Sequence, residues 1–195
     1  MEGVKQYIQF LQGGVVGVAA KDGKLLWHYD HPAPQGMGTP CSTPIFQDGS
    51  VFAAAGYRTG GGQAKITKDG DTFKAKETYF VEKLQNQHGG IVLVDGFIYG
   101  TSESELFCVD FKTGKIAWED ESVGKGSLVY ADGHLYALGE EGVVGFVEAT
   151  PAAYREVSRF EIPKGGYPAW SQPVIANGKL YLREQDNLFC YNIKK

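Results

Sequence analysis

The chain has 195 residues, of which 43% are hydrophobic and 22% are charged, and its formal net charge is -4. These values are ordinary for a globular protein that buries a core. The sequence contains no long runs of Lys or Arg, which leaves a nucleic-acid or anionic-membrane partner without electrostatic support. No apolar run approaches the roughly 20 residues that span a bilayer. Residues 1–12 lack a basic region followed by an apolar core, so no signal peptide is predicted there.

The cysteine and glycine contents indicate the class of fold. An odd count of three cysteines (Cys41, Cys108 and Cys190) argues against a disulfide framework. No CxxC or CxxCH occurs, which argues against a zinc knuckle or a covalently attached haem. The 27 glycines, together with 11 Tyr and 11 Phe, predict many short strands joined by tight turns.

Four hairpin signals recur along the chain. Each is an Asp-Gly or Asn-Gly pair between apolar or alternating segments, which favours a type I′ turn. Their spacings are 47, 37 and 45 residues, which is the length of a four-stranded propeller blade. The four pairs are Asp48-Gly49, Asp95-Gly96, Asp132-Gly133 and Asn177-Gly178.

A second sequence element follows the hairpins. LFCVDFKTGKIAW, which begins at Leu106, repeats VVGVAAKDGKLLW, which begins at Val15, and both end on a tryptophan. A degenerate copy spans 63–80 and is predicted to turn at Asp69-Gly70, and another spans 143–162. In chain order, the predicted repeats cover 5–30, 41–83, 88–122, 125–163 and 170–195. No stretch sustains a helical i, i+3, i+4, i+7 apolar pattern, so the fold is expected to be all-β.

The pattern xVDxxTGKxxW after a DGxxY hairpin resembles the PQQ-like repeat of quinoprotein β-propellers. The stretches VVGVAAKDGKLLWHYDHPA, HGGIVLVDGFIYG, DFKTGKIAWEDESVGKGSL and PVIANGKLYLREQDNLFCY resemble the C-terminal half of the PQQ-like repeat proteins of planctomycete-type bacteria. The resemblance implies antiparallel blades, and this chain would supply about four and a half of them, a partial or half propeller. It also implies that Trp27 and Trp118 dock between neighbouring blades. Members of that family are roughly twice as long, often exported, and mostly without an assigned role.

The first repeat lacks its first strand and the last repeat lacks its fourth strand. An open propeller leaves two unpaired sheet edges. Three outcomes follow: pairing with another copy as a homodimer, closure into a small ring, or association with a missing half-propeller. A self-associating fragment is the favoured outcome at this point.

In a propeller, the loops that enter the first strand of each blade surround one mouth of the central channel. Counting seven residues back from each hairpin turn gives Cys41, His88, Lys125 and Trp170, which should occupy equivalent places near this mouth. Asn86 and Ser127 lie close by in sequence. These six residues are the candidates for a ligand site. The alternative is that they satisfy backbone groups of the loops and plug the channel.

The resemblance raises the possibility of PQQ with calcium as a cofactor. The resemblance implies that a working quinoprotein dehydrogenase would have a site with oxygen ligands for Ca²⁺, a catalytic Asp and an aromatic platform beneath the quinone. Trp170 could be the platform, but the four counted positions contain no Asp or Glu, and the adjacent-cysteine pair of many alcohol dehydrogenases is absent. The Gly-rich stretch 56–62, with Arg58, lacks the GK[ST] ending of a phosphate loop and is predicted to be a long loop.

Further expectations concern the remaining thiols and imidazoles. Cys108 and Cys190 occupy equivalent third-strand positions and are expected to be buried and too far apart for a disulfide. The four histidines show no HxH or HExxH spacing, so no metal site is predicted, although His28 and His31 flank a Pro-containing loop. His134 follows a turn and is expected to be exposed.

Three functions remain open at the level of sequence. The first is a non-catalytic binding or scaffold module whose channel mouth takes a protein, a peptide or a small ligand. The second is part of a PQQ-dependent quinoprotein oxidoreductase. The third is a structural half-propeller that self-associates. The family resemblance, rather than the residues, carries this choice. The sequence indicates no membrane insertion and no compartment.

Overall fold

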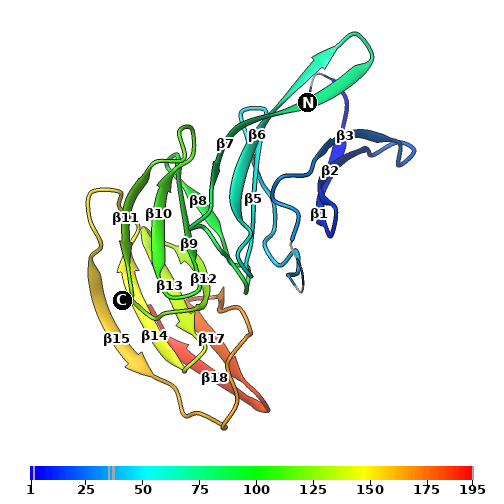
Figure 1. Cartoon of the computed structure of the whole chain (residues 1–195). Coiled ribbons are helices and arrows are strands. Elements are labelled where there is room, and N and C mark those ends of the chain that lie inside the picture. The colour runs from blue at the N-terminus through cyan, green and yellow to red at the C-terminus, as the bar shows by residue number, and fades with distance from the viewer. Residues whose placement is uncertain (2, 35, 37, 195) are drawn as a thin grey trace. The chain divides into compact units, whose positions relative to one another are not determined.

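The computed structural model describes residues 1, 3–34, 36 and 38–194 (Figure 1). The described residues form strands β1 to β18 and no helix. It follows that they contain no helix able to cross a membrane. The chain forms two compact units, Met1–Gln87 and His88–Lys195, and each is described by itself. Lys195, the end of the predicted fifth repeat, lies outside the described residues.

The first compact unit contains two antiparallel sheets in which sequential strands are neighbours. The first sheet has the order β1-β2-β3 and the second has the order β4-β5-β6-β7. Their strands are β1 (Gln6–Leu11), β2 (Gly14–Ala19), β3 (Leu25–Tyr29), β4 (Ile45–Gln47), β5 (Ser50–Ala55), β6 (Gly60–Asp69) and β7 (Thr72–Val81).

The second compact unit, coloured green to red in Figure 1, contains three sheets of the same kind. The third and fourth sheets run β8-β9-β10-β11 and β12-β13-β14-β15, and the fifth runs β16-β17-β18. Their strands are β8 (Val92–Val94), β9 (Phe97–Thr101), β10 (Leu106–Asp110), β11 (Ile116–Asp120), β12 (Gly126–Ala131), β13 (His134–Gly139), β14 (Val143–Glu148), β15 (Glu156–Glu161), β16 (Val174–Ala176), β17 (Lys179–Glu184) and β18 (Asn187–Asn192). Each sheet lies within one predicted repeat.

The hairpin turns have the backbone geometry that their sequences predict. Asp48, Asp95, Asp132 and Asn177 have φ between 48 and 53°, and the glycine after each also has a positive φ. Positive φ at both central residues is the mark of a type I′ turn, whose twist suits antiparallel strands.

Two predicted loop boundaries were wrong. Asp69 pairs with Thr72, so the turn residues between β6 and β7 are Gly70 and Asp71, rather than Asp69-Gly70. The predicted loop 56–62 is shorter, because residues 60–62 already belong to β6. The strand carries glycine at these positions because neighbouring atoms leave no space for a side chain. A Cβ on Gly62, for example, would lie 2.2 Å from the Tyr29 hydroxyl.

The turn between the third and fourth strands explains the VDxxTGK pattern. The Asp110 carboxylate accepts hydrogen bonds from the backbone N–H groups of Lys112 and Thr113, at 3.0 and 2.8 Å, and from the Thr113 hydroxyl. Gly114 follows with a φ of 72°, a conformation that glycine adopts without steric cost. Although partial burial raises the pKa of Asp110, the hydrogen bonds from Thr113 and Lys112 lower it below its usual value.

The last strand of each of the first four sheets contains a β-bulge at the same place. The register shifts directly after Gly17, Gln63, Cys108 and Phe146 on the preceding strand, and the unpaired residue lies on the last strand. The residues that pair with these four on the outer strand are Trp27, Tyr79, Trp118 and Ser158. Three of the four outer positions therefore carry an aromatic side chain, and the fourth sheet carries a serine.

The two tryptophans of this series join neighbouring sheets within their compact units. Trp118 is buried in a cluster with Leu128, Leu135 and Val147 of the fourth sheet. Trp27 is buried in a cluster that includes Val51 of the second sheet. The hydrophobic cores therefore lie between successive sheets.

The expectation for the two third-strand cysteines was half wrong. Cys108 is fully buried, whereas Cys190 is exposed. Cys190 lies on β18, and among the described residues no fourth strand pairs with β18. The burial of a residue on the third strand of a repeat thus depends on whether a fourth strand pairs with that strand, as well as on the residue's position in the repeat.

Candidate functional site

Three of the four residues counted back from the hairpin turns come together within the second compact unit. His88 precedes β8, Lys125 directly precedes β12, and Trp170 precedes β16, so each belongs to a different sheet. All three contact the carboxylate of Glu140, which directly follows β13. We call these four residues the Glu140 network.

The Glu140 carboxylate accepts three polar contacts. Its Oε1 lies 2.8 Å from Trp170 Nε1 and 3.0 Å from His88 Nε2, and its Oε2 lies 3.0 Å from Lys125 Nζ. The exposed fractions of the His88, Glu140 and Lys125 side chains are 10%, 18% and 29%. Ion pairs this well shielded from water interact more strongly than surface pairs.

Backbone hydrogen bonds hold the network in place. Glu140 N–H donates to the Lys125 carbonyl at 2.8 Å, which extends the β12–β13 ladder by one rung. Ala169 N–H donates to the Glu140 carbonyl at 2.9 Å, which fixes the segment that carries Trp170. The Ser127 hydroxyl, which is also buried, donates to the Ser171 carbonyl at 3.3 Å. Ser127 therefore supports the segment around Trp170 rather than contacting the carboxylate.

His88 is set up to remain neutral. Burial lowers the pKa of His88 below its ordinary value, and the nearby Lys125 ammonium lowers it further, although Glu140 opposes both effects. With Nε2 donating to Glu140, the buried Nδ1 has no hydrogen-bond partner among the residues that the structure describes. A second proton on Nδ1 would be a buried donor without an acceptor, which is costly.

The remaining candidates, Cys41 and Asn86, belong to the first compact unit. Cys41 is exposed, with its Sγ 2.9 Å from Thr39 Oγ1, and Asn86 is fully buried. Their grouping with the other candidates stays a prediction.

Sequence reasoning missed Glu140, the centre of the network. The signal was available in the hairpin register: the residue seven before a two-residue turn pairs with the residue eight after its first position. Applied to the turn at Asp132, this rule pairs Lys125 with Glu140. Only one strand of each hairpin was considered in the prediction.

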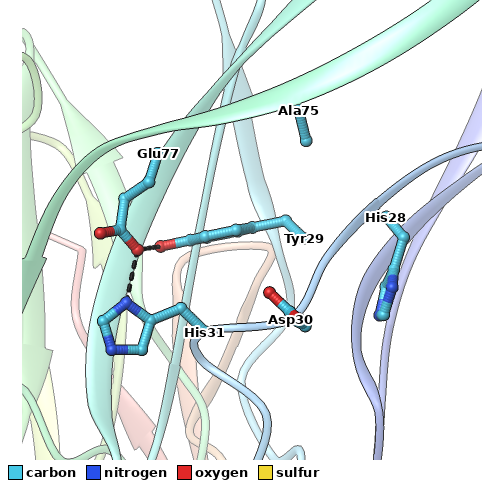
Figure 2. A pocket seen from close by; sticks show the side chains of 6 residues that line it. All are labelled: His28, Tyr29, Asp30, His31, Ala75 and Glu77. Atoms are coloured by element: carbon cyan, nitrogen blue, oxygen red, sulfur yellow. Dashed lines mark hydrogen bonds and ion pairs between the residues drawn. The ribbon is translucent and has the colours of Figure 1, made fainter.

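The first compact unit contains a separate polar cluster (Figure 2). The Tyr29 hydroxyl donates to Glu77 Oε2 at 2.8 Å, and His31 Nδ1 lies 2.5 Å from the same oxygen. His31 also stacks on Phe80, with ring centroids 3.7 Å apart. Burial, followed by the hydrogen bond to Glu77, raises the pKa of Tyr29 well above its ordinary value, so the phenol stays protonated.

This cluster joins β3 to β7 and does not resemble a metal centre. His28, the other histidine of the pocket, lies apart from Glu77 in Figure 2 and contacts the Gly13 carbonyl, with its Nε2 2.7 Å away. Within the described residues, no group of three or more His, Cys, Asp or Glu side chains could hold a metal ion. His134, expected to be exposed, is half-buried because its ring stacks on Phe146 at 4.3 Å.

The donor set of the Glu140 network does not fit a calcium-bound quinone. Calcium needs six to eight oxygen ligands, whereas Glu140 already accepts from an ammonium, an imidazole and an indole. What the arrangement does is fix the indole of Trp170 while leaving 66% of that residue exposed. This geometry suits binding by an aromatic surface better than proton transfer.

Comparisons with known proteins show the family to which the chain belongs. A family model described as outer membrane protein assembly factor BamB matches residues 1–120. BamB from Moraxella catarrhalis is a similar solved structure, with a TM-score of 0.68 and 15% identity over 92% of this chain and 52% of that chain. Quinohemoprotein alcohol dehydrogenase from Comamonas testosteroni has a TM-score of 0.63 and 11% identity over 91% of this chain and 42% of that chain. The computationally designed Ika8 protein has a TM-score of 0.55 and 12% identity over 96% and 67%.

The chain thus spans about half the length of the first two of these structures. At such identities the likeness concerns the fold alone. No curated protein sequence matches the chain. The repeat pattern, the successive four-stranded sheets and the family match over residues 1–120 agree with one another. The chain belongs to the PQQ-like repeat family described as outer membrane protein assembly factor BamB, and its fold is a β-propeller of antiparallel blades, three of which have four strands in the described residues.

Proposed function

We propose that this chain is a non-catalytic protein-binding module, and that Trp170, fixed by Glu140, anchors its partner. The family to which the chain belongs is described as an outer membrane protein assembly factor, a role exercised on other proteins. The proposal extends that kind of role to this chain.

The observation that carries the proposal is the orientation of Trp170. Its indole N–H is satisfied by Glu140 at 2.8 Å, so the ring loses little rotational freedom when a partner covers it. The residue as a whole is two-thirds exposed. Tryptophan is enriched among the residues that dominate protein interfaces, and an ordered aromatic side chain contributes a large contact area at low entropic cost.

The chemistry of the network also favours binding over catalysis. Lys125 neutralises the Glu140 carboxylate, and the lowered pKa of His88 keeps its ring uncharged. A general base needs a proton acceptor that can reach a substrate, but the Glu140 oxygens are already engaged and His88 is nine-tenths buried. The most exposed part of the network is therefore Trp170.

The test uses a set of fluorescein-labelled peptides that tile outer membrane protein sequences, with binding followed by fluorescence polarisation. We expect a subset to bind saturably, and Trp170→Ala to weaken that binding at least tenfold. Tyr7→Ala is the matched control, because Tyr7 on β1 is a comparably exposed aromatic residue in the first compact unit. Saturable binding that is equally strong in wild type and Trp170→Ala would overturn the role of Trp170. The complete absence of binding peptides would overturn the proposal of a protein-binding module.

A further inference from the structure

The outer strand of the fourth sheet departs from the pattern of the other sheets. At the outer-strand position directly after the unpaired bulge residue, the first and third sheets carry Trp27 and Trp118, and the fourth carries Ser158. In each compact unit the tryptophan is buried against the following sheet. The position of Ser158 therefore faces the place where a docking ring is found elsewhere in the chain.

The surroundings of Trp118 define what such a ring needs. Its ring lies 5.9 Å from the ring of Tyr99 and 5.7 Å from that of Tyr154, and its Nε1 donates to the Thr150 carbonyl at 2.7 Å. Leu135 of the next sheet belongs to the same buried cluster. The site thus combines an aromatic wall, aliphatic packing and one carbonyl acceptor.

The repeat places the same elements beside Ser158. Tyr136 lies four residues after its turn Asp, as Tyr99 does, and Leu180 lies three residues after its turn Asn, as Leu135 lies after its turn Asp. Lys194 follows the end of β18 by two residues, as Thr150 follows the end of β14. Tyr136, Ser158, Leu180 and Lys194 all line one groove between the fourth and fifth sheets.

This groove has a volume of about 840 Å³, and its walls are mainly aromatic and aliphatic. Tyr136 contacts Phe146 at a ring distance of 4.8 Å, and Phe160 contacts Tyr191 at 4.9 Å. Volumes of roughly 300 to 1,000 Å³ are typical of ligand sites. The charged residues in its lining, Asp132 and Lys194, have opposite signs, which favours a neutral group over an ion.

We propose that this groove binds an indole-type aromatic ring carried by the side chain of a peptide partner. The ring takes the place that Trp118 occupies in the preceding groove, against Tyr136 and Leu180, with the Lys194 carbonyl as the acceptor for its N–H. A cavity of about 150 Å³ is enough for a benzene-sized ring, so this groove has room for the residues on either side of the aromatic one. That spare room is the reason for assigning the ring to a peptide rather than to a free small molecule.

The proposal goes beyond the function proposed for Trp170, because it concerns another surface and a different set of contacts. Either proposal can be wrong while the other is right. Loss of the Glu140 network leaves the lining of this groove unchanged, and filling the groove leaves Trp170 exposed.

The experiment measures binding of the blocked peptide Ac-Gly-Gly-Trp-Gly-Gly-NH₂ by ligand-observed NMR, with the corresponding alanine peptide as the negative control. We expect saturable binding of the tryptophan peptide to the wild type, to Ser158→Ala and to Trp170→Ala. Ser158→Trp fills the groove with the chain's own ring and should weaken binding at least tenfold. Ser158→Phe serves the same purpose with a smaller ring if Ser158→Trp does not fold, as checked by circular dichroism.

Three results would overturn the inference. The first is the absence of saturable binding of the tryptophan peptide to the wild type. The second is undiminished binding by a folded Ser158→Trp or Ser158→Phe variant. The third is binding of free indole without binding of the tryptophan peptide, which would remove the assignment to a peptide partner.

Discussion

Replacing Glu140 with alanine should destabilise the second compact unit, because three donors would lose their shared acceptor. A hydrogen bond to a charged group contributes about 1.5–3 kcal/mol. The three contributions do not add, because they share one carboxylate. Lys125 can turn toward water, whereas His88 is only 10% exposed and has no such alternative.

These considerations place the expected loss between two limits. Exposed ion pairs contribute about 0–1 kcal/mol, and breaking a buried pair costs about 3–5 kcal/mol. For side chains that are 10 to 29% exposed, we expect Glu140→Ala to cost about 2–3 kcal/mol. Glu140→Gln keeps the shape and one acceptor, and it should cost about half as much.

Urea unfolding followed by tryptophan fluorescence and circular dichroism measures this loss. With a slope of about 1–3 kcal/mol/M, Glu140→Ala should lower the midpoint by roughly 1–2 M. Glu141→Ala is the matched control, because the neighbouring Glu141 side chain is 71% exposed and pairs with Lys164 at the surface. A loss for Glu140→Ala no larger than that for Glu141→Ala, about 0.5 kcal/mol or less, would refute the reasoning.

Four other outcomes are expected. Burial lowers the pKa of His88 in the folded state, so the contribution of His88 to stability is present above its unfolded-state pKa of about 6.5 and is lost as the pH falls below that pKa. The urea midpoint should therefore decrease from pH 7.5 to pH 5, and it should decrease less steeply in His88→Gln. Equal dependence of the midpoint on pH in the two proteins would contradict this. In Ellman titrations at pH 8, the exposed Cys41 and Cys190 should react in the native protein, whereas Cys108, whose pKa burial raises to about 11, should react only after unfolding; three fast thiols would count against the packing described. Trp118→Ala should cost about 3–5 kcal/mol by calorimetry or urea unfolding, because a buried ring is removed, and a cost below about 1 kcal/mol would show that the ring does not join the sheets. PQQ with Ca²⁺ should produce no saturable change in absorbance, and a saturable change would contradict the non-catalytic proposal.

The regular parts of the fold could be predicted because each is decided by a few neighbouring residues. Asp132-Gly133 requires positive φ at two successive positions, and few turns other than type I′ provide it. Asp110, Thr113 and Gly114 likewise determine the next turn through their own hydrogen bonds and backbone conformation. Such local rules repeat with the sequence, which is why the sheets lie within the predicted repeats.

The parts that were mispredicted depend on neighbours that are distant in the chain. Gly62 appeared to belong to a loop because glycine usually marks one, but it lies in a strand where Tyr29 leaves no room for a side chain. Cys190 and Cys108 both end an LFC sequence, yet the exposure of each is set by the strand beside it.

The candidate site was found in part for the same reason. Repeat arithmetic located His88, Lys125 and Trp170, which lie at the same offset from their turns. At the corresponding offset after the turn, the other three hairpins carry Gly56, Glu103 and Gln185, so a second glutamate, Glu103, occurs there. Which of these side chains receives the three donors depends on contacts between sheets, and a single repeat does not contain that information.

The bulge on the outer strand, opposite Gly17, Gln63, Cys108 and Phe146, has a consequence for how such chains change over time. Because a bulge increases the local twist of its own strand, the same twist is set within each of these four sheets. We therefore expect that duplication, deletion or exchange of a whole sheet leaves the strand register of the other sheets unchanged. Members of the family can therefore differ in length while keeping the same interlocking between adjacent modules, and an engineered chimera that joins at the loops between sheets should inherit that tolerance.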